Sequence, residues 1–348
     1  MSADQVAITA VGGGADAFRR TVLRVDGLTV SFETEEGALQ AVRGTSWEVR
    51  EGETVVILGE SGSGKSVSAH AIAGLLPSNA VLGGTVDFVG RDLLKMNRKE
   101  FRKVQAHDIG MIFQDPLSSL NPCYTVGDHI AEILRVHTGM RRRAAAARAV
   151  EMLDLVRIAD PERRARQYPH EMSGGMRQRV MIAMAITLDP KLLIADEPTT
   201  ALDTTVRGSV LATMQEMRDR LGMGVVLITH DIGVAAAVAD RVVVMYGGRV
   251  VEYGPAAEVL LEPIHPYTAA LLESMPRLER HDSNLRAIRG TPPSLRSMPP
   301  GCAFAPRCEF ARDRCTLEVP APLPVLSSSR VAACHFAEEI RKGEHRAE

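Results

Sequence analysis

The chain has 348 residues, of which 45% are hydrophobic and 24% are charged, and this ordinary usage excludes a disordered, collagen-like or coiled-coil protein. Its length suits one large domain with an appendage, or two modest domains. The formal net charge of -2 argues against a general nucleic-acid binder, because affinity for a phosphate backbone needs an excess of Lys and Arg. We expect no secretion signal and no membrane-spanning helix, since no basic segment precedes an apolar one at the N-terminus and no long uninterrupted apolar run occurs.

The predicted elements begin after a Gly- and Ala-rich tail, residues 1–20, which we expect to be flexible. Residues 22–32 and 46–50 have the alternating or β-branched pattern of antiparallel strands. Short, wholly apolar runs then recur between stretches of helical composition, as expected for strands buried on both faces. These runs are 54–58, 109–113, 192–195, 225–228 and 242–245. The alternation indicates an α/β fold with a mostly parallel core sheet, beside an antiparallel β subdomain.

The order of elements also predicts a domain organisation. Residues from about 116 to 187 are mostly helix formers, which indicates a helical subdomain inserted into a nucleotide-binding domain of residues 21–275. Prolines multiply after 276, so residues 276–348 are expected to form a small, irregular C-terminal extension. No internal repeat is present.

Residues 59–66, Gly-Glu-Ser-Gly-Ser-Gly-Lys-Ser, fit the phosphate-loop pattern G-x-x-x-x-G-K-[ST]. A chance glycine-rich turn is the alternative, but a buried strand precedes the motif and a helical run, 67–74, follows it. Such a loop points backbone N–H groups at phosphate oxygens, and the helix N-terminus adds partial positive charge. Lys65 would neutralise the β- and γ-phosphates, and Ser66 would bind Mg²⁺. The expected nucleotide contacts are Gly59, Ser61, Gly62, Ser63, Gly64, Lys65 and Ser66.

Two adjacent carboxylates, Asp196 and Glu197, follow the apolar run 192–195, at the strand end where α/β sheets place ligands. Alone they are a weak signal, because acidic residues at strand ends often cap the next helix. After a phosphate loop they are stronger, since phosphoryl transfer needs a carboxylate for the metal and a group that orients water.

The segment Ser173-Gly-Gly-Met-Arg-Gln-Arg179 resembles the signature sequence of the ABC ATPases. The resemblance implies a role for several other residues, in the order in which the family's motifs occur. These are Phe32 stacking on adenine, Gln114 of the Q-loop as a further Mg²⁺ contact, Asp196 binding Mg²⁺, Glu197 as the catalytic base, Ala201-Leu202-Asp203 as the D-loop, and His230 as the switch histidine. For His230 a hydrogen-bonded structural histidine is the alternative.

The signature implies a dimer. Ser173, Gly174 and Gly175 are expected to begin a helix whose N-terminus closes over the γ-phosphate held by a partner subunit, so that ATP joins the two halves. Two positions depart from the common pattern, where Met172 replaces Leu and Met176 replaces Gln. Met at the second position is ordinary in peptide-importer ATPases, so it does not indicate an inactive site.

Further segments resemble the ATPases of oligopeptide and dipeptide importers, over about residues 22–336. They are 114–122, 168–176, 265–267, 290–295 and 301–308. This resemblance implies a peripheral protein at the cytoplasmic face of the inner membrane. Its expected partners are a second ATPase subunit, two permease subunits and an extracytoplasmic substrate-binding protein. Nickel importers share much of the extension, so dipeptide, longer peptide and nickel remain open as cargo, as do homo- and heterodimers.

Four of the five cysteines, Cys302, Cys308, Cys315 and Cys334, are close together in the sequence of the extension. Their spacing does not fit the paired C-x₂-C pattern of zinc ribbons, whereas four thiolates on irregular loops suit an iron–sulfur cluster. The importer family is known to carry a [4Fe–4S] cluster there; zinc, reduced thiols and disulfides are the alternatives. We expect Cys123 to be a buried small hydrophobe.

Two functions of other classes remain. A soluble ABC ATPase acting on ribosomes or DNA would normally have tandem cassettes or a long coiled coil, and this sequence has neither. A non-hydrolysing regulatory subunit would not need an intact catalytic set, yet all five of its members are present: Lys65, Gln114, Glu197, Asp203 and His230.

Overall fold

The computed structural model describes residues 19–200, 202–274, 288–325 and 329–342. The chain forms two compact units. The first contains Met1–Val49, Thr54–Leu94 and Thr229–Glu348, and the second contains Arg50–Glu53 and Lys95–Ile228. The predicted tail up to residue 18, the predicted boundary near 276 and Ala201 lie outside the described residues.

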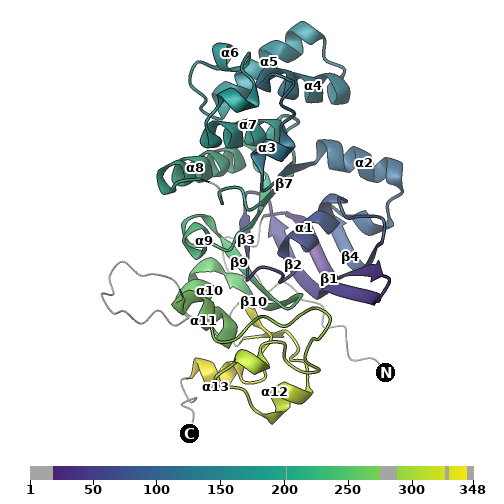
Figure 1. The fold of residues 1–348 in the computed structure, drawn as a ribbon, viewed down its shortest axis with the longest axis vertical. Coiled ribbons are helices and arrows are strands. Elements are labelled where there is room, and N and C mark those ends of the chain that lie inside the picture. Colours follow the sequence, from purple (N-terminus) through teal and green to yellow (C-terminus); the bar gives the residue numbers. More distant parts are fainter. Residues whose placement is uncertain (1–18, 201, 275–287, 326–328, 343–348) are drawn as a thin grey trace. The chain divides into compact units, whose positions relative to one another are not determined.

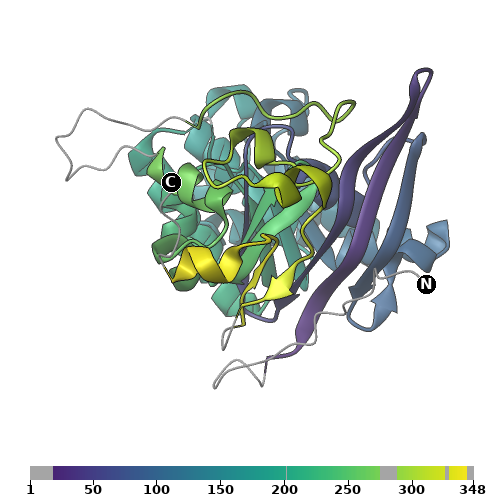
Figure 2. The same cartoon turned by 90° about the horizontal axis from the view of Figure 1, so that it is seen from below.

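The first unit contains a four-stranded sheet in the order β2-β1-β4-β5. Its strands are β1 Thr21–Thr34, β2 Gly37–Arg50, β4 Ala80–Phe88 and β5 Arg91–Asp92. Figure 2 shows β1 and β2 as long purple strands that lie side by side. β1 and β4 are antiparallel, and their buried residues face each other, as Val25 does Val86. The antiparallel strands expected at 22–32 and 46–50 are therefore present, whereas β4 was not predicted.

A second group of strands in this unit follows the order β11-β12-β10-β9-β3. The strands are β3 Thr54–Leu58, β9 Arg241–Tyr246, β10 Arg249–Pro255, β11 Leu323–Pro324 and β12 Val331–Ala332. β3 and β9 are parallel and buried along their whole length, as their apolar composition predicts. The others pair antiparallel, so the extension adds main-chain pairing to β10 (Figure 2).

Short helices complete the first unit. They are α1 Lys65–Ala73, α9 Ile232–Val238, α10 Ala256–Leu261, α11 Pro266–Glu273, α12 Asp313–Leu317 and α13 Ala337–Arg341, with 3-10 turns Leu93–Lys95 and Ala305–Arg307. A small core joins the extension to the loop before α11, because Ile264, Val325 and Ala332 pack together with Ala337 against them. The extension is therefore part of this unit and has an apolar contact of its own with it.

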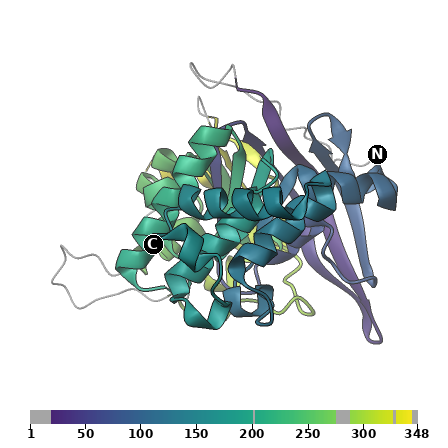
Figure 3. The ribbon, with the colours of Figure 1, turned by 90° about the horizontal axis from the view of Figure 1, so that it is seen from above.

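The second unit contains three parallel strands in the order β8-β7-β6, namely β6 Ile109–Ile112, β7 Leu192–Asp196 and β8 Gly224–Ile228. Its helices are α2 Arg98–His107, α3 Pro116–Ser119, α4 Val126–Thr138, α5 Arg142–Leu155, α6 Pro161–Arg164, α7 Gly174–Ile186 and α8 Thr204–Leu221, with a 3-10 turn Pro169–Glu171. Helices α4, α5 and α7, teal in Figures 1 and 3, pack against one another within the stretch predicted to be helical. No helix in the described part of the chain is long and apolar enough to cross a membrane.

Candidate nucleotide site and cysteine pocket

The phosphate loop connects β3 to α1 in the first unit and depends on glycine. Gly59, Gly62 and Gly64 have φ of 153°, 78° and 97°, a region that side-chain-bearing residues rarely adopt. A Cβ on Gly59 would lie 2.3 Å from the Met245 carbonyl oxygen, and one on Gly64 would lie 2.7 Å from that of Ala41. Both positions therefore exclude a larger residue, as expected of a loop whose backbone wraps a phosphate.

Lys65 begins α1 and extends along the loop. Its buried Nζ donates hydrogen bonds to the carbonyl oxygens of Gly59, at 2.8 Å, and Glu60, at 2.9 Å. Ser63 Oγ is also buried and has no hydrogen-bond partner among the residues that the structure describes. A buried hydroxyl without a partner is costly unless a ligand or water satisfies it, so this atom is a further sign of a binding loop.

Phe32 and His230 are in the same unit as Lys65 and Ser66. Phe32 is half-buried near the end of β1, where it pairs with Ala80 of β4. His230 is exposed immediately before Asp231, whose carboxylate caps α9 by accepting a hydrogen bond from Val234 N. Its exposure fits a side chain available to a ligand better than a histidine held in a core.

Gln114 and Glu197 come together in the second unit. Gln114 follows β6 and donates from Nε2 to Glu197 Oε2 at 3.2 Å, and Thr200 Oγ1 donates to the same oxygen at 3.0 Å. Asp196 ends β7 and is buried. Glu197 has φ of 47°, although it is not glycine, and its N–H donates to Ile228 O at 2.9 Å. A strained backbone of this kind is typical of functional positions, where it directs a side chain that a regular strand would direct elsewhere.

The signature segment begins α7, as predicted. Ser173 is the N-cap, and its Oγ accepts a hydrogen bond from Met176 N at 3.3 Å. Gly175 lies against α8, because a Cβ there would be 2.3 Å from Cγ1 of Val206. Asp203 caps α8 in the same way, by accepting from Val206 N at 2.9 Å. The first turn of α7 begins at Gly174 and Gly175, and the N–H groups of a first helical turn have no partner within the helix itself, as an anion site requires.

The unusual Met172 is buried, 5% exposed, and so replaces one core hydrophobe by another. The predicted nucleotide-site residues are divided between the two units. Phe32, Lys65, Ser66 and His230 belong to the first, and Gln114, Ser173, Asp196, Glu197 and Asp203 belong to the second.

All four cysteines of the extension line one pocket, part of which is open to solvent. Its other walls are mostly apolar, formed by residues such as Phe304, Phe310, Phe336 and Ile340. Cys302 N donates to Cys315 O at 2.8 Å, which fixes two of the cysteine-bearing segments to each other. The four cysteines lie on different segments within residues 302–334, and the fold collects their side chains around a single space.

Burial raises the pKa of three of these thiols, to about 12 for Cys308, to about 11 for Cys334, and upward for Cys302 as well. Those three thiols are therefore protonated at neutral pH until a ligand displaces the protons. All five cysteines are free of disulfides. Within the described ranges, no group of three or more His, Cys, Asp or Glu is arranged to hold a single metal ion.

The expectation for Cys123 was wrong, because this residue is exposed. Its N–H donates to Asn121 Oδ1 at 3.0 Å, and Tyr124 N donates to Asn121 O at 3.2 Å, so Asn-Pro-Cys-Tyr forms a surface turn. The Asn-Pro pair was the available signal for a turn.

Sequence reasoning also missed Glu60 and Arg307. Glu60 occupies an unspecified position of the phosphate loop, and Arg307 lies in the extension, yet their side chains form an ion pair with an N–O distance of 2.6 Å. No local pattern indicates a contact between residues 247 positions apart.

Comparison with known families finds two matches along the chain. Residues 42–200 match the ABC transporter family, and residues 251–315 match the C-terminal region of oligopeptide/dipeptide transporters. The second match covers Cys302, Cys308 and Cys315.

Curated relatives match along nearly the whole chain. The oligopeptide transport ATP-binding protein OppD of Salmonella typhimurium is 46% identical over 90% of this chain and 93% of its own. The dipeptide transport ATP-binding protein DppD of Bacillus subtilis is 47% identical over 93% of this chain and 96% of its own.

Among solved structures, a dimeric ATP-binding cassette, MJ0796, in a post-hydrolysis state with ADP and Pi is similar, with a TM-score of 0.60 and 28% identity over 67% of this chain and 98% of that one. CbiO1 of Clostridium perfringens, part of an ABC transporter complex, also has a TM-score of 0.60, with 30% identity over 70% of this chain and 92% of its own. The loop, carboxylates and signature helix thus occur in a chain whose relatives bind ATP. This chain belongs to the ABC transporter ATP-binding subunits that carry the oligopeptide/dipeptide transporter C-terminal region, and it is an ATPase that powers transport.

Proposed function

We propose that this ATPase is bound at the cytoplasmic face of the inner membrane and powers the import of di- or oligopeptides into the cell. The observation that carries the proposal is the C-terminal region, because residues 251–315 match the oligopeptide/dipeptide transporter region and the named relatives transport oligopeptides or dipeptides. The required partners are a second, related ATP-binding subunit, two permease subunits and an extracytoplasmic substrate-binding protein.

Each residue of the site has a part in this function. Lys65 and the N–H groups of residues 59–64 bind the β- and γ-phosphates, and Phe32 stacks on the adenine ring. Ser66, Gln114 and Asp196 would hold Mg²⁺, which would neutralise phosphate charge when bound. Glu197 orients the attacking water, and His230 contacts the γ-phosphate.

The partner subunit completes the site. The first-turn N–H groups of α7, with the Ser173 hydroxyl and the glycines Gly174 and Gly175, fit a phosphate group held by the other subunit. Asp203 caps α8 by accepting from Val206 N, and the side chain of Val206 lies against Gly175. Asp203 therefore fits a place at the same dimer contact. ATP then joins the subunits, and hydrolysis releases them.

The cysteine pocket fits a [4Fe–4S] cluster better than one zinc ion. A cubane cluster takes one thiolate at each of its four irons, so its ligands surround a space instead of converging on one point. Four cysteines that line one largely apolar pocket are compatible with that requirement. The cluster would fasten the segments of the extension together, with Cys302, Cys308, Cys315 and Cys334 as ligands.

The transport proposal is tested in liposomes that contain the complete importer and a labelled peptide. We expect uptake that requires ATP and the substrate-binding protein and that stops when the chain carries Glu197→Gln. Uptake of labelled nickel without peptide would contradict the proposal, as would purification of the chain with ribosomes or DNA in place of permeases.

The cluster is tested separately, by iron and sulfide analysis and by the visible absorbance of anaerobically purified protein. We expect four irons and four sulfides per chain, as a [4Fe–4S] cluster requires, and their loss in Cys308→Ser. The exposed Cys123→Ser is the matched control and should keep the colour. A colourless, iron-free preparation that folds normally would exclude the cluster. One zinc per chain in such a preparation would show that the cysteines bind zinc instead.

A further inference from the structure

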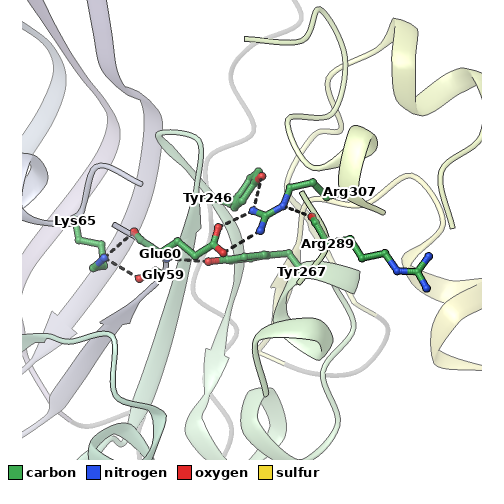
Figure 4. Close-up of polar contacts among 7 residues, drawn as sticks. All are labelled: Gly59, Glu60, Lys65, Tyr246, Tyr267, Arg289 and Arg307. Carbon is green, nitrogen blue, oxygen red and sulfur yellow. Dashed lines mark hydrogen bonds and ion pairs between the residues drawn. The ribbon is translucent and has the colours of Figure 1, made fainter. Parts of the chain in front are cut away.

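A buried ion pair links the C-terminal extension to the phosphate loop (Figure 4). Arg307 donates from its two terminal nitrogens to the two carboxylate oxygens of Glu60, at 2.6 and 3.1 Å. The side chain of Arg307 is 5% exposed and that of Glu60 is 24% exposed. A two-pronged contact of this kind fixes both position and orientation, and solvent screens it little.

The remaining nitrogen of Arg307 is also bonded. Nε donates to Arg289 O at 2.8 Å, and one terminal nitrogen donates to the Tyr246 hydroxyl at 3.1 Å. Glu60 raises the pKa of Arg307, so the guanidinium keeps its charge at any physiological pH. The arginine is thus held in one position from both sides, by the extension and by β9.

Glu60 is held at all three of its polar groups. Its carboxylate receives Arg307, its N–H donates to the Tyr267 hydroxyl at 2.9 Å, and its carbonyl oxygen accepts from Lys65 Nζ at 2.9 Å. A continuous path of hydrogen bonds therefore leads from Arg307 through Glu60 to the lysine of the phosphate loop (Figure 4).

Aromatic packing supports the same contact. The ring centroid of Phe304 lies 5.3 Å from that of Tyr246 and 5.4 Å from that of Tyr267, both in edge-on geometry. Phe304 and Arg307 share a 3-10 turn, in which Arg307 N donates to Phe304 O at 2.9 Å. The turn that carries the arginine is therefore fixed against the domain by a ring as well as by charge.

The ion pair also neutralises the negative charge that Glu60 brings to the phosphate loop. A carboxylate in a loop that binds triphosphate repels the ligand, and this repulsion is strong where water is partly excluded. Arg307 neutralises that carboxylate and holds it in one orientation through two hydrogen bonds. Removing the arginine would leave the carboxylate of this loop residue without its cation, and would release a residue whose carbonyl oxygen accepts from Lys65.

We propose that Arg307 is a positioning residue for ATP binding, which acts through Glu60 to hold the phosphate loop in its phosphate-accepting form. It does not touch the nucleotide in this role. The extension then contributes to the affinity of the site for ATP, in addition to any part it has in assembling the transporter.

The test uses the full-length chain with Mg·ATP, and measures the ATP dissociation constant by calorimetry and KM and kcat in the assembled importer. Arg307→Met should weaken ATP binding by roughly tenfold or more, and Glu60→Gln by about fivefold, within the usual range of coupling between sites. Both should raise KM with a much smaller change in kcat. Arg307→Lys should recover part of the affinity, because it restores the charge without the two-pronged contact.

The double variant distinguishes action through Glu60 from general loosening. With Glu60→Gln already present, Arg307→Met should add no further loss, since the arginine has no carboxylate left to neutralise or hold. Arg312→Met is the matched control. It breaks an exposed pair with Glu339, at 3.2 Å in the same extension, and should leave ATP affinity at the wild-type value.

Three results would overturn the proposal. They are wild-type ATP affinity in folded Arg307→Met, an equal loss in Arg312→Met, and an undiminished effect of Arg307→Met in the Glu60→Gln background. If circular dichroism shows that Arg307→Met does not fold, Glu60→Gln decides alone, and wild-type ATP affinity in that variant refutes the role.

Discussion

Gln114 and Glu197 are hydrogen-bonded side chain to side chain, which connects the loop after β6 to the carboxylate after β7. The two residues are 83 positions apart in the sequence. The same Glu197 oxygen also accepts from Thr200, and the backbone of Glu197 has a left-handed φ. The carboxylate is therefore held in a defined place by its own strained backbone and by two donors, as a group that orients a water molecule must be.

The first prediction concerns that carboxylate. Glu197→Gln should lower the ATP turnover number by about 10²- to 10⁴-fold, the range for loss of a positioned general base. ATP affinity should stay close to the wild-type value, because Lys65 and the loop glycines are unchanged. Steady-state phosphate release and equilibrium ATP binding measure the two quantities.

Glu216→Gln is the matched control for this variant. Glu216 lies on α8 in the same unit and forms an exposed pair with Arg157 at 2.6 Å. Its turnover should equal that of the wild type. Near-normal hydrolysis in Glu197→Gln would transfer the water-orienting role to another residue.

The second prediction compares two helical glycines. Gly175→Ala places a Cβ against Cγ1 of Val206, which is on a β-branched side chain with little freedom to move. We expect a loss of about 1–3 kcal/mol in the free energy of unfolding from this overpacking. Denaturant titration followed by circular dichroism measures it.

Gly208→Ala is its counterpart on α8, because a Cβ there meets no atom within 4 Å. The same substitution should stabilise the chain by roughly 0.5–1 kcal/mol, since alanine loses less conformational freedom in a helix. Equal effects at the two positions would show that the close approach of α7 and α8 is not a constraint.

The third prediction concerns the buried pair of Arg330 and Glu252. Arg330 is 5% exposed and Glu252 is fully buried, and the arginine also donates to Glu262 O. Arg330→Met leaves the carboxylate buried without its cation and should cost about 3–5 kcal/mol of stability. Urea titration of the purified chain is the measurement.

Arg314→Met provides the comparison, because the pair of Arg314 with Glu318 is 59% exposed on both sides. Its effect on the free energy of unfolding should be negligible, because water screens an exposed pair. If the two variants are equally stable, the Arg330 pair does not hold the extension in place.

The fourth prediction follows from His265, whose complete burial lowers its pKa to about 3. The folded chain keeps this imidazole neutral, whereas the unfolded chain protonates it below about 6.5. The unfolded state thus binds the extra proton between these values, so stability is complete above pH 6.5 and falls as the pH is lowered toward 3. Glu252 faces the same backbone, since its carboxylate accepts from His265 N at 3.0 Å.

His265→Asn should flatten this acid-side slope. Asn keeps an acceptor for the Tyr267 N–H that His265 Nδ1 now receives at 3.1 Å, so the start of α11 retains its cap. His137→Asn, at an exposed position, should keep the wild-type slope. Unfolding free energies between pH 4 and 8 give the comparison, and a slope unchanged in His265→Asn would assign the acid sensitivity to other groups.

Much of this molecule could be predicted from the sequence where local chemistry decides the structure. The run Thr54–Leu58 is wholly apolar and forms a strand with those bounds, because only a strand buried on both faces accommodates it. Ser173 before two glycines predicted the start of α7, since a serine hydroxyl is a good N-cap. These inferences need only the neighbours of each residue.

Other features depend on residues distant in the sequence and were not predictable in this way. Arg307 reads as one more charged residue between two cysteines until the fold brings it to Glu60. β12 is two residues long and carries no strand pattern, yet it pairs with β10. The prediction for Cys123 was wrong because free cysteine is usually a buried residue type, whereas the turn formed by Asn121 places it at the surface.

The pairing of β12 with β10 affects the tendency of the chain to aggregate. Glu252 and Tyr253 of β10 face Ala332 and Val331, and Ala333 N donates to Val251 O at 2.8 Å. Without those partners, β10 would present unsatisfied peptide groups that attract strands of other molecules. A chain cut short before the extension would therefore tend to self-associate and precipitate, so the extension protects the solubility of the domain that precedes it.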